Sequence, residues 1–151
     1  MNEMFDDILE KGEQIIKVFK PNKERYWKMF HLFWKIPLLW PYVLLMSIPT
    51  LFILPVFILK ISKKTYENTY YCYTNKRLII RSGAYGISYS SLNFKDINST
   101  NVIVGFLDSK TNTGMLTFKS PSLHYSAIVF DNIENPYAVM KEIKEYIDTV
   151  K

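Results

Sequence analysis

The stretch "YCYTNKRLIIRSG", residues 71–83, joins two runs rich in Tyr, Ile and Leu through a short polar segment. Such runs are typical of β-strands, and "TNK" offers the side chains that turns favour. Parallel strands need a long crossover, and this gap is too short to hold one. The stretch therefore predicts an antiparallel hairpin.

The same pattern continues on both sides of this hairpin. Segments with turn chemistry, "SG", "DSKTNTG" and "SPS", separate further runs of alternating polarity. The runs are "NTYYCYT", "KRLIIRS", "AYGISYS", "NVIVGFL", "GMLTFKS" and "HYSAIVF". They predict a curved antiparallel sheet of meandering strands.

A helix is expected to close the chain. Asn135 can cap it and Pro136 suits its first turn. One apolar stripe is predicted to face the sheet: Val139, Ile143, Tyr146, Ile147 and Val150. Residues 66–151 therefore predict a mainly β domain whose open end is plugged by a C-terminal α-helix.

Upstream lies an uncharged stretch, "IPLLWPYVLLMSIPTLFILPVFIL", residues 36–59. As one helix it would extend about 36 Å, enough for a hydrocarbon core of about 30 Å. Pro49 argues against one straight rod, because lipid cannot replace the backbone hydrogen bond that an interior proline removes. A helical hairpin or re-entrant loop over residues 29–62, with limbs 29–46 and 50–62 turning at "SIPT", is the preferred interpretation. One tilted crossing is the alternative, and a soluble core is the least favoured.

Basic residues flank this stretch on both sides, which by the positive-inside rule predicts that both flanks face the cytoplasm. Only a fold-back satisfies that rule. Six residues are expected at the bilayer interface: Tyr26, Trp27, Lys28, Trp34, Lys35 and Lys60. The expected location is the cell membrane, with residues 66–151 in the cytoplasm.

Residues 1–28 are expected to form a separate cytoplasmic segment. "NEMFDDILEK" is predicted to hold a short amphipathic helix ending at Gly12, and "QIIKVFK" an extended segment ending at Pro21. The segment is acidic at its start, which is unlike a cleavable signal peptide.

The sequence offers little for catalysis. It contains no HExxH, GxSxG or phosphate-binding glycine loop, and its two histidines lie far apart. The single cysteine, Cys72, reads as a buried strand residue. The chain has a net charge of +5 and basic residues beside its apolar segment. This combination favours attraction to anionic lipid over nucleic acid. We expect no enzyme activity, cofactor, metal, small-molecule substrate or nucleic-acid partner.

Several motifs together resemble the membrane-associated branch of the bacterial pleckstrin-homology-like (PH-like) domains. They are the Tyr-x-x-Thr-x-x-Arg-Leu-Ile…Gly pattern in residues 71–83, "SLNFKDINSTNVIV", "GMLTFKS" and "IVFDNIENPYAVMKEIKEYI". "GEQIIKVFKP", residues 12–21, looks like the segment that precedes two membrane helices in that family. The resemblance covers about residues 66–150 and implies a seven-stranded, partly open barrel capped by one helix. The chain shows six clear strands, and "LNFKDI" is expected to hold the seventh.

The resemblance also implies a function. Eukaryotic relatives of this fold bind phosphoinositides through basic residues of the first hairpin turn, where this chain has Lys76 and Arg77. Possible headgroup contacts are therefore Lys76, Arg77 and Arg81, with Lys63 and Lys64 beside the membrane. A plain solvated turn is the favoured interpretation of Lys76 and Arg77, and Arg77 can instead fix the hairpin through hydrogen bonds.

The leading hypothesis is a membrane-anchored, non-catalytic interaction module that binds a protein partner or itself. Self-assembly is implied only by the resemblance. An anionic headgroup sensor is the first alternative, and an accessory subunit of a membrane enzyme or transporter is the second.

Overall fold

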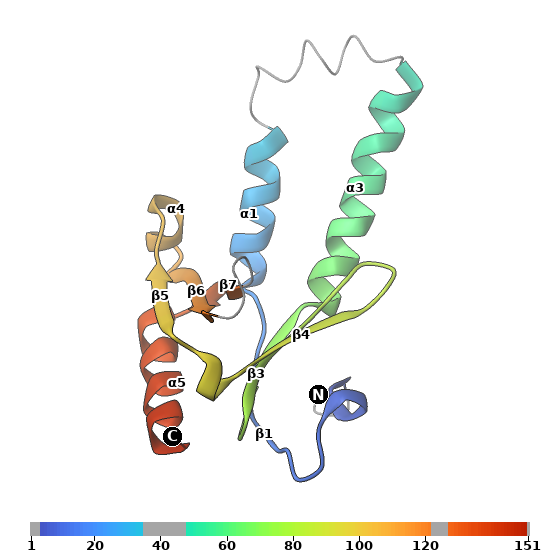
Figure 1. Cartoon of the computed structure of the whole chain (residues 1–151). Helices are drawn as coiled ribbons and strands as arrows, with labels where there is room; N and C mark the ends of the chain where they lie inside the picture. Colours follow the sequence, from blue (N-terminus) through green and yellow to red (C-terminus); the bar gives the residue numbers. More distant parts are fainter. Residues whose placement is uncertain (1–3, 35–47, 122–126, 151) are drawn as a thin grey trace.

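Two antiparallel sheets organise the chain (Figure 1), seen in a computed structural model that describes residues 4–34, 48–121 and 127–150. The first sheet has the order β1-β2-β3-β4 and the second the order β5-β6-β7. The strands of the described residues are β1 (Ile15–Phe19), β2 (Tyr70–Thr74), β3 (Arg77–Ser82), β4 (Ser88–Asn93), β5 (Ser99–Ile103), β6 (Thr113–Lys119) and β7 (Ala127–Glu134).

The hairpin predicted from residues 71–83 is confirmed. Strands β2 and β3 pair antiparallel with Cys72 opposite Ile79, and the turn between them holds only Asn75 and Lys76. Strand β4 continues the meander, with Ser91 opposite Ile79.

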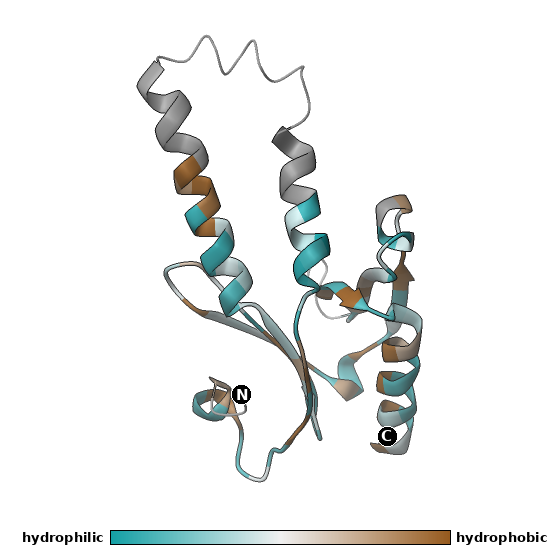
Figure 2. Ribbon diagram, turned by 180° about the vertical axis from the view of Figure 1, so that it is seen from behind, coloured by the Kyte–Doolittle hydropathy of each residue, from teal (hydrophilic) through white to brown (hydrophobic). Residues whose placement is uncertain are grey.

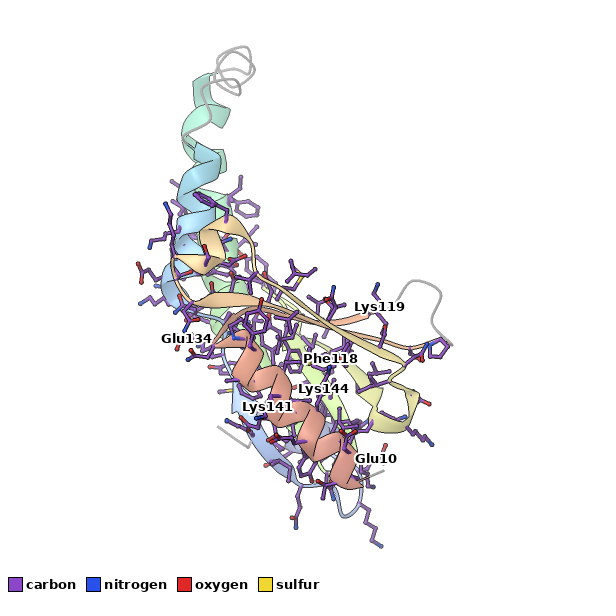
Figure 3. All side chains as sticks on the ribbon, turned by 90° about the vertical axis from the view of Figure 1, so that its left-hand side faces the viewer. Glu10, Phe118, Lys119, Glu134, Lys141 and Lys144 are labelled. Carbon is purple, nitrogen blue, oxygen red and sulfur yellow. The ribbon has the colours of Figure 1, made fainter. Side chains whose placement is uncertain are left out.

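The main core fills the space between the two sheets and α5 (Pro136–Val150). Figure 3 shows Phe118 of β6 beneath α5, with Lys141 and Lys144 on that helix. Helix α5 contributes the buried side chains Met140, Ile143 and Ile147, so the predicted plugging helix is confirmed. Val150 was also expected on the buried stripe, but it lies in the last turn and is 47% exposed.

Strand β2 is buried on both faces, which explains why all five of its residues are inaccessible. Tyr71 and Tyr73 point into the main core, whereas Tyr70 and Cys72 point to the other face, as the two-residue period of a strand requires. The burial predicted for Cys72 is confirmed, since none of its surface is exposed.

The N-terminal segment covers that second face. Phe5, just before the 3₁₀ helix η2 (Asp6–Ile8), is fully buried and forms a second cluster with Tyr70, Cys72 and Ile79. The predicted extended segment is confirmed as β1, which pairs with β2. Residues 4–19, which were expected to lie in an N-terminal segment spanning residues 1–28, therefore pack against the first sheet.

Strand β1 also supplies the seventh strand, so its expected position in "LNFKDI" was wrong. Leu92 and Asn93 end β4, and the following residues form the 3₁₀ helix η4 (Phe94–Asp96). The chain bends there because Phe94 turns into the main core, where it is 3% exposed.

Helices α1 (Lys23–Trp34) and α3 (Ile48–Asn68) leave the sheets at one end of the molecule (Figure 1). Phe19, the last residue of β1, pairs with Tyr71 near the start of β2, and this antiparallel pairing places both helix bases together. The two helices therefore run in opposite directions away from and back to the domain. Their bases touch: the rings of Tyr26 and Tyr66 lie 5.2 Å apart, and the Tyr26 hydroxyl donates to the Ser62 carbonyl over 3.1 Å.

The predicted turn at "SIPT" needs correction. Residues 48–50 are already helical, and Pro49 lies in the first turn of α3, where its missing N–H costs no helix hydrogen bond. The second limb continues to Asn68, well past its expected end at residue 62. Residues 35–47, which hold much of the first limb and Lys35, lie outside the described residues. None of the helices in the described ranges combines the length and apolar character needed for a membrane crossing.

Candidate functional site

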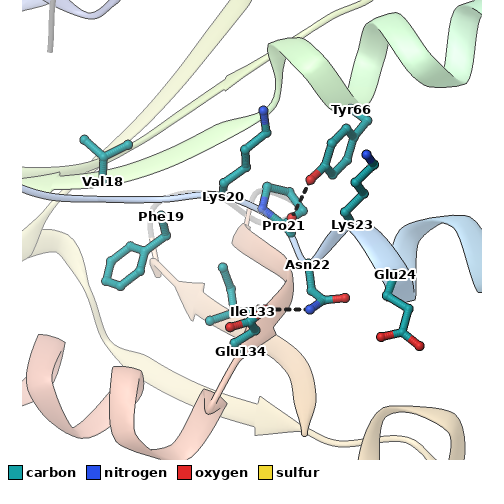
Figure 4. Close-up of a pocket in the computed structure, with 10 residues that line it drawn as sticks. All are labelled: Val18, Phe19, Lys20, Pro21, Asn22, Lys23, Glu24, Tyr66, Ile133 and Glu134. Carbon is teal, nitrogen blue, oxygen red and sulfur yellow. Dashed lines mark hydrogen bonds between the residues drawn. The ribbon is translucent and has the colours of Figure 1, made fainter. Parts of the chain in front are cut away.

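A pocket of about 600 Å³ lies where the helices join the sheets (Figure 4). It is lined by Val18, Phe19, Lys20, Pro21, Asn22, Lys23, Glu24, Tyr66, Ile133 and Glu134. The lining comes from β1, α1, α3 and β7, so the pocket marks the joint between domain and helices.

Lys20 is held against two aromatic rings at this joint. Its Nζ lies 5.0 Å from the ring centroid of Tyr66 and 4.6 Å from that of Tyr70, and it donates to the Tyr70 hydroxyl over 3.1 Å. The ring faces attract the ammonium group, so this lysine, which directly follows β1, links the β1–α1 connection to the base of α3 and to β2.

Asn22 fixes the start of α1 to β7. Its Oδ1 accepts a hydrogen bond from the Arg25 amide over 2.8 Å, which is the geometry of a helix N-cap. Its own amide donates to the Asn132 carbonyl over 2.7 Å, and its Nδ2 donates to Glu134. Asn22, the residue that caps α1, therefore ties the start of this helix to the second sheet.

A buried ion pair reinforces that attachment. Arg25 of α1 has 6% of its side chain exposed and pairs with Asp108 in α4 (Phe106–Ser109), the connection between β5 and β6. The pKa of nearby Asp131 is raised, mainly by burial, and the negative charge of Asp108 raises it further. The hydrogen bond from the Asn132 amide and the positive charge of Arg25 act in the opposite direction. Because a buried charge without a partner is costly, this pair couples the orientation of α1 to α4.

The predicted headgroup residues fall into two groups at opposite ends of the domain formed by the sheets. Lys76 and Arg77 bind Glu10, which Figure 3 labels at the end away from the helices, whereas Glu134 marks the helix-bearing end. Strand β2, about 17 Å long at 3.3 Å per residue, separates the two ends.

Arg77 is occupied within the domain. Its Nε and Nη2 bind the two carboxylate oxygens of Glu13, each over 2.9 Å, and Nη2 also donates to the Ile8 carbonyl over 2.8 Å. Thr74 adds a 2.7 Å hydrogen bond to the same carboxylate. Burial acts to raise the pKa of Glu13, but the hydrogen bonds from Arg77, the Glu10 amide and Thr74 outweigh it and hold that pKa below its usual value. This geometry ties the N-terminal segment to the hairpin.

Arg81, Lys63 and Lys64 belong to the helix-bearing end. The Arg81 Nη1 donates to the Asn68 carbonyl over 3.0 Å, at the last residue of α3. Lys63 and Lys64 are exposed in the same helix. The five predicted contacts therefore do not form one site.

Known proteins share this architecture. The bacterial PH domain family matches residues 31–151. The chain belongs to that family. The similar solved structures include a DUF1696 family protein with a pleckstrin-homology domain from Shewanella loihica PV-4 and a pleckstrin homology domain from Shewanella amazonensis SB2B.

The likeness to these structures shows the fold. The first is 14% identical with a TM-score of 0.52 and covers 97% of this chain and 92% of that chain. The second is 15% identical with the same TM-score of 0.52 and covers 97% of this chain and 94% of that chain. No curated protein matches this chain. PH domains are generally non-catalytic and generally mediate lipid or protein interactions.

In this bacterial PH domain, the residues expected at a bilayer interface lie on the two helices, apart from Lys35, which is outside the described residues. Tyr26 packs against Trp27 with ring centroids 5.8 Å apart, and Lys28 pairs with Glu24 over 2.6 Å. Lys60 is exposed on α3, and Trp34 is the last residue of α1.

Sequence reasoning missed the residues that attach the helices. The Pro21-Asn22 step before a charged run carried the cap signal, since Asn favours the position before a helix. No local sequence pattern indicates the role of Arg25, because its partner Asp108 lies 83 positions away in the chain.

Proposed function

We propose that this bacterial PH domain is a membrane-anchored, non-catalytic interaction module. The apolar segment that includes the outer part of α3 would enter the bilayer. The sheets would stay at the cytoplasmic face and bind a protein partner or a second copy.

The change in polarity along α3 supports this proposal. Lys63 and Lys64 are exposed near the domain, whereas Val56 and Phe57, further out, are each 52% exposed and Leu59 is 40% exposed. Figure 2 shows the described part of α3 passing from hydrophilic at its base to hydrophobic further out. Apolar side chains grouped on the outer surface of a helix favour a non-aqueous environment, and lysines beside them favour its edge.

The arrangement of the two helices gives further support. Helices α1 and α3 leave one end of the domain in opposite chain directions, and contacts between Tyr26 and Tyr66 hold their bases together. A chain that enters and leaves a membrane on one side needs this arrangement. The basic residues that flank the apolar stretch, including Lys23, Lys28 and Lys60, favour the cytoplasmic side for both bases.

The exposed apolar surface of α3 is the observation that carries the proposal, and flotation tests it. The full chain, reconstituted with phosphatidylcholine and phosphatidylglycerol vesicles and washed with alkaline carbonate, should float with the vesicles. Val56→Asp combined with Phe57→Asp should reduce the floating fraction, because charges at these positions oppose burial in hydrocarbon.

A matched control separates this effect from a general loss of folding. Ile16→Asp places a charge at a side chain that is 45% exposed on β1, away from the helices, and should leave flotation unchanged. Release of the unmodified chain by carbonate would overturn the proposal.

The headgroup-sensor alternative has less support at Lys76 and Arg77. They lie at the end opposite the helices, and Arg77 is held by Glu13 and the Ile8 carbonyl. Any lipid contact of an anchored domain belongs at the helix-bearing end.

A further inference from the structure

Two aromatic side chains protrude from the helix-bearing end of the domain. Phe106, the first residue of α4, is 77% exposed, and Tyr85 in the β3–β4 connection is 68% exposed. The main core and the second cluster contain neither of them. Ile103, at the end of β5, and Ile87, beside Tyr85, are also about half exposed, at 49% and 48%.

A lysine ammonium group lies over each of the two aromatic rings. Lys110 Nζ lies 4.8 Å from the ring centroid of Phe106, and Lys64 Nζ lies 4.6 Å from that of Tyr85. We call these two residue pairs the α4 pair and the loop pair. Each combines an apolar face with a positive charge.

The two pairs flank the helices. The α4 pair sits beside α1, because Asp108 of α4 binds Arg25 of α1. The loop pair sits beside α3, because Lys64 belongs to that helix and the Asn68 Nδ2 donates to the Gly83 carbonyl over 2.9 Å. Figure 1 shows α4 and the β3–β4 connection on the side of the sheets from which the helices project.

Both connections are locally fixed. Asp108 Oδ2 accepts a hydrogen bond from the Gly105 amide over 2.9 Å, so one carboxylate both starts α4 and binds α1. Gly83 has φ +141°, and a Cβ there would lie 1.8 Å from the Gly86 carbonyl oxygen, so the β3–β4 connection requires glycine. The two segments that bear the exposed aromatic rings are therefore held in defined conformations.

We propose that the α4 pair and the loop pair form a second contact with the membrane, in which the domain rests on an anionic bilayer surface on both sides of its helices. This inference rests on the proposed function, because the helices bring that surface to this end of the domain.

The chemistry favours a bilayer over a protein. A tyrosine ring such as that of Tyr85 prefers the headgroup level of a bilayer, and an apolar ring such as that of Phe106 is buried at the boundary between headgroups and acyl chains. Lysines near an anionic surface are attracted to it. Cores of protein–protein interfaces are depleted in lysine. The two pairs lie on opposite sides of the helix bases, so one flat surface that surrounds the helices can touch both.

Site-directed spin labelling of the full chain in vesicles tests this contact. Labels at Ser109→Cys in α4 and Gly86→Cys in the loop report on the two pairs without removing their rings, and a Cβ at Gly86 meets nothing within 4 Å. Lys144→Cys, exposed on the outside of α5, is the water-facing reference. The native Cys72 stays unlabelled because it is buried, which raises the pKa of its thiol to about 12.

With phosphatidylglycerol present, the labels at 109 and 86 should be shielded from a water-soluble nickel relaxant, and the label at 144 should not. Lys110→Glu and Lys64→Glu should each weaken docking by at least about fivefold, the factor that corresponds to about 1 kcal/mol per basic residue. Phe106→Ser with Tyr85→Ser should expose both labels. The control variant Val150→Ser changes an apolar side chain that is 47% exposed at the C-terminal end of α5. This variant should leave both labels shielded.

The results also separate this inference from the proposed function. If the chain floats but the labels at 109 and 86 are as exposed as that at 144, the second contact is overturned and the anchor stands. Shielding that persists in phosphatidylcholine vesicles and in high salt would overturn the role of the lysines. If the chain does not float, both proposals fail.

Discussion

Glu13 shows how single residues hold this domain together. It lies in the N-terminal segment with its side chain fully buried, and Arg77, Thr74 and the Glu10 amide satisfy its carboxylate. The sequence predicted that Arg77 can fix the hairpin, and the structure places its partner 64 positions away. No local pattern reveals such a pair, because it forms only when the N-terminal segment folds onto the sheet.

Replacing this carboxylate should weaken the fold. Glu13→Gln keeps the shape but removes the charge that binds Arg77, and should lower the free energy of unfolding by about 1–3 kcal/mol. Thermal unfolding of the full chain in mild detergent, followed by near-UV circular dichroism, measures the loss. A variant as stable as the unmodified chain would contradict the role given to the pair.

The same pair predicts a pH dependence. The pKa of Glu13 is lowered in the folded chain, so its ionised form adds stability at pH values above its ordinary pKa of 4.5, and this stability is lost as the pH falls through the lowered value. The stability difference between the unmodified chain and Glu13→Gln should therefore shrink below pH 4.5. A difference that stays constant down to acid pH would show that the carboxylate's charge plays no part.

At the scale of elements, strands were easier to predict than their partners. The runs in residues 66–134 indicated six strands, and the structure has strands in all six segments, though "AYGISYS" supplies only the start of β4. The seventh strand was misplaced because Ile15–Phe19 is separated from β2 by the two helices, and only pairing with Tyr71–Thr74 identifies it as part of the sheet. The "LNFKDI" segment looked like a strand because Phe94 and Ile97 are apolar, but they serve a bend that packs into the main core.

The attachment of α1 provides a prediction at this scale. Asn22→Ala removes the helix cap and the bond to Glu134, and should cost about 1 kcal/mol of stability. Asn22→Ser retains a capping hydroxyl and should recover most of the loss. Denaturant unfolding in detergent compares the three chains, and equal stability of the Ala and Asn forms would contradict the capping role.

At the scale of the whole molecule, the sequence indicated the fold class and its family resemblance. It did not indicate at which end of the domain the two helices and the basic turn of the first hairpin lie. Lys76 and Arg77 drew attention as the basic turn of the first hairpin, yet the antiparallel pairing of β1 with β2 puts that turn at the end opposite the helices. The sequence did not identify Phe106 and Tyr85 as candidate contact residues, since a single exposed aromatic residue has no sequence pattern.

The central claim is that the outer part of α3 lies in a bilayer while the sheets stay on its cytoplasmic side. Single cysteines at Phe57→Cys and Lys144→Cys test it directly with a membrane-impermeant thiol reagent, applied to right-side-out and inverted bacterial membrane vesicles. Position 144, exposed on α5, should react only in inverted vesicles, and position 57, exposed on α3, should react in neither until detergent is added. Rapid reaction at position 57 in intact vesicles, at a rate like that of position 144, would contradict the account.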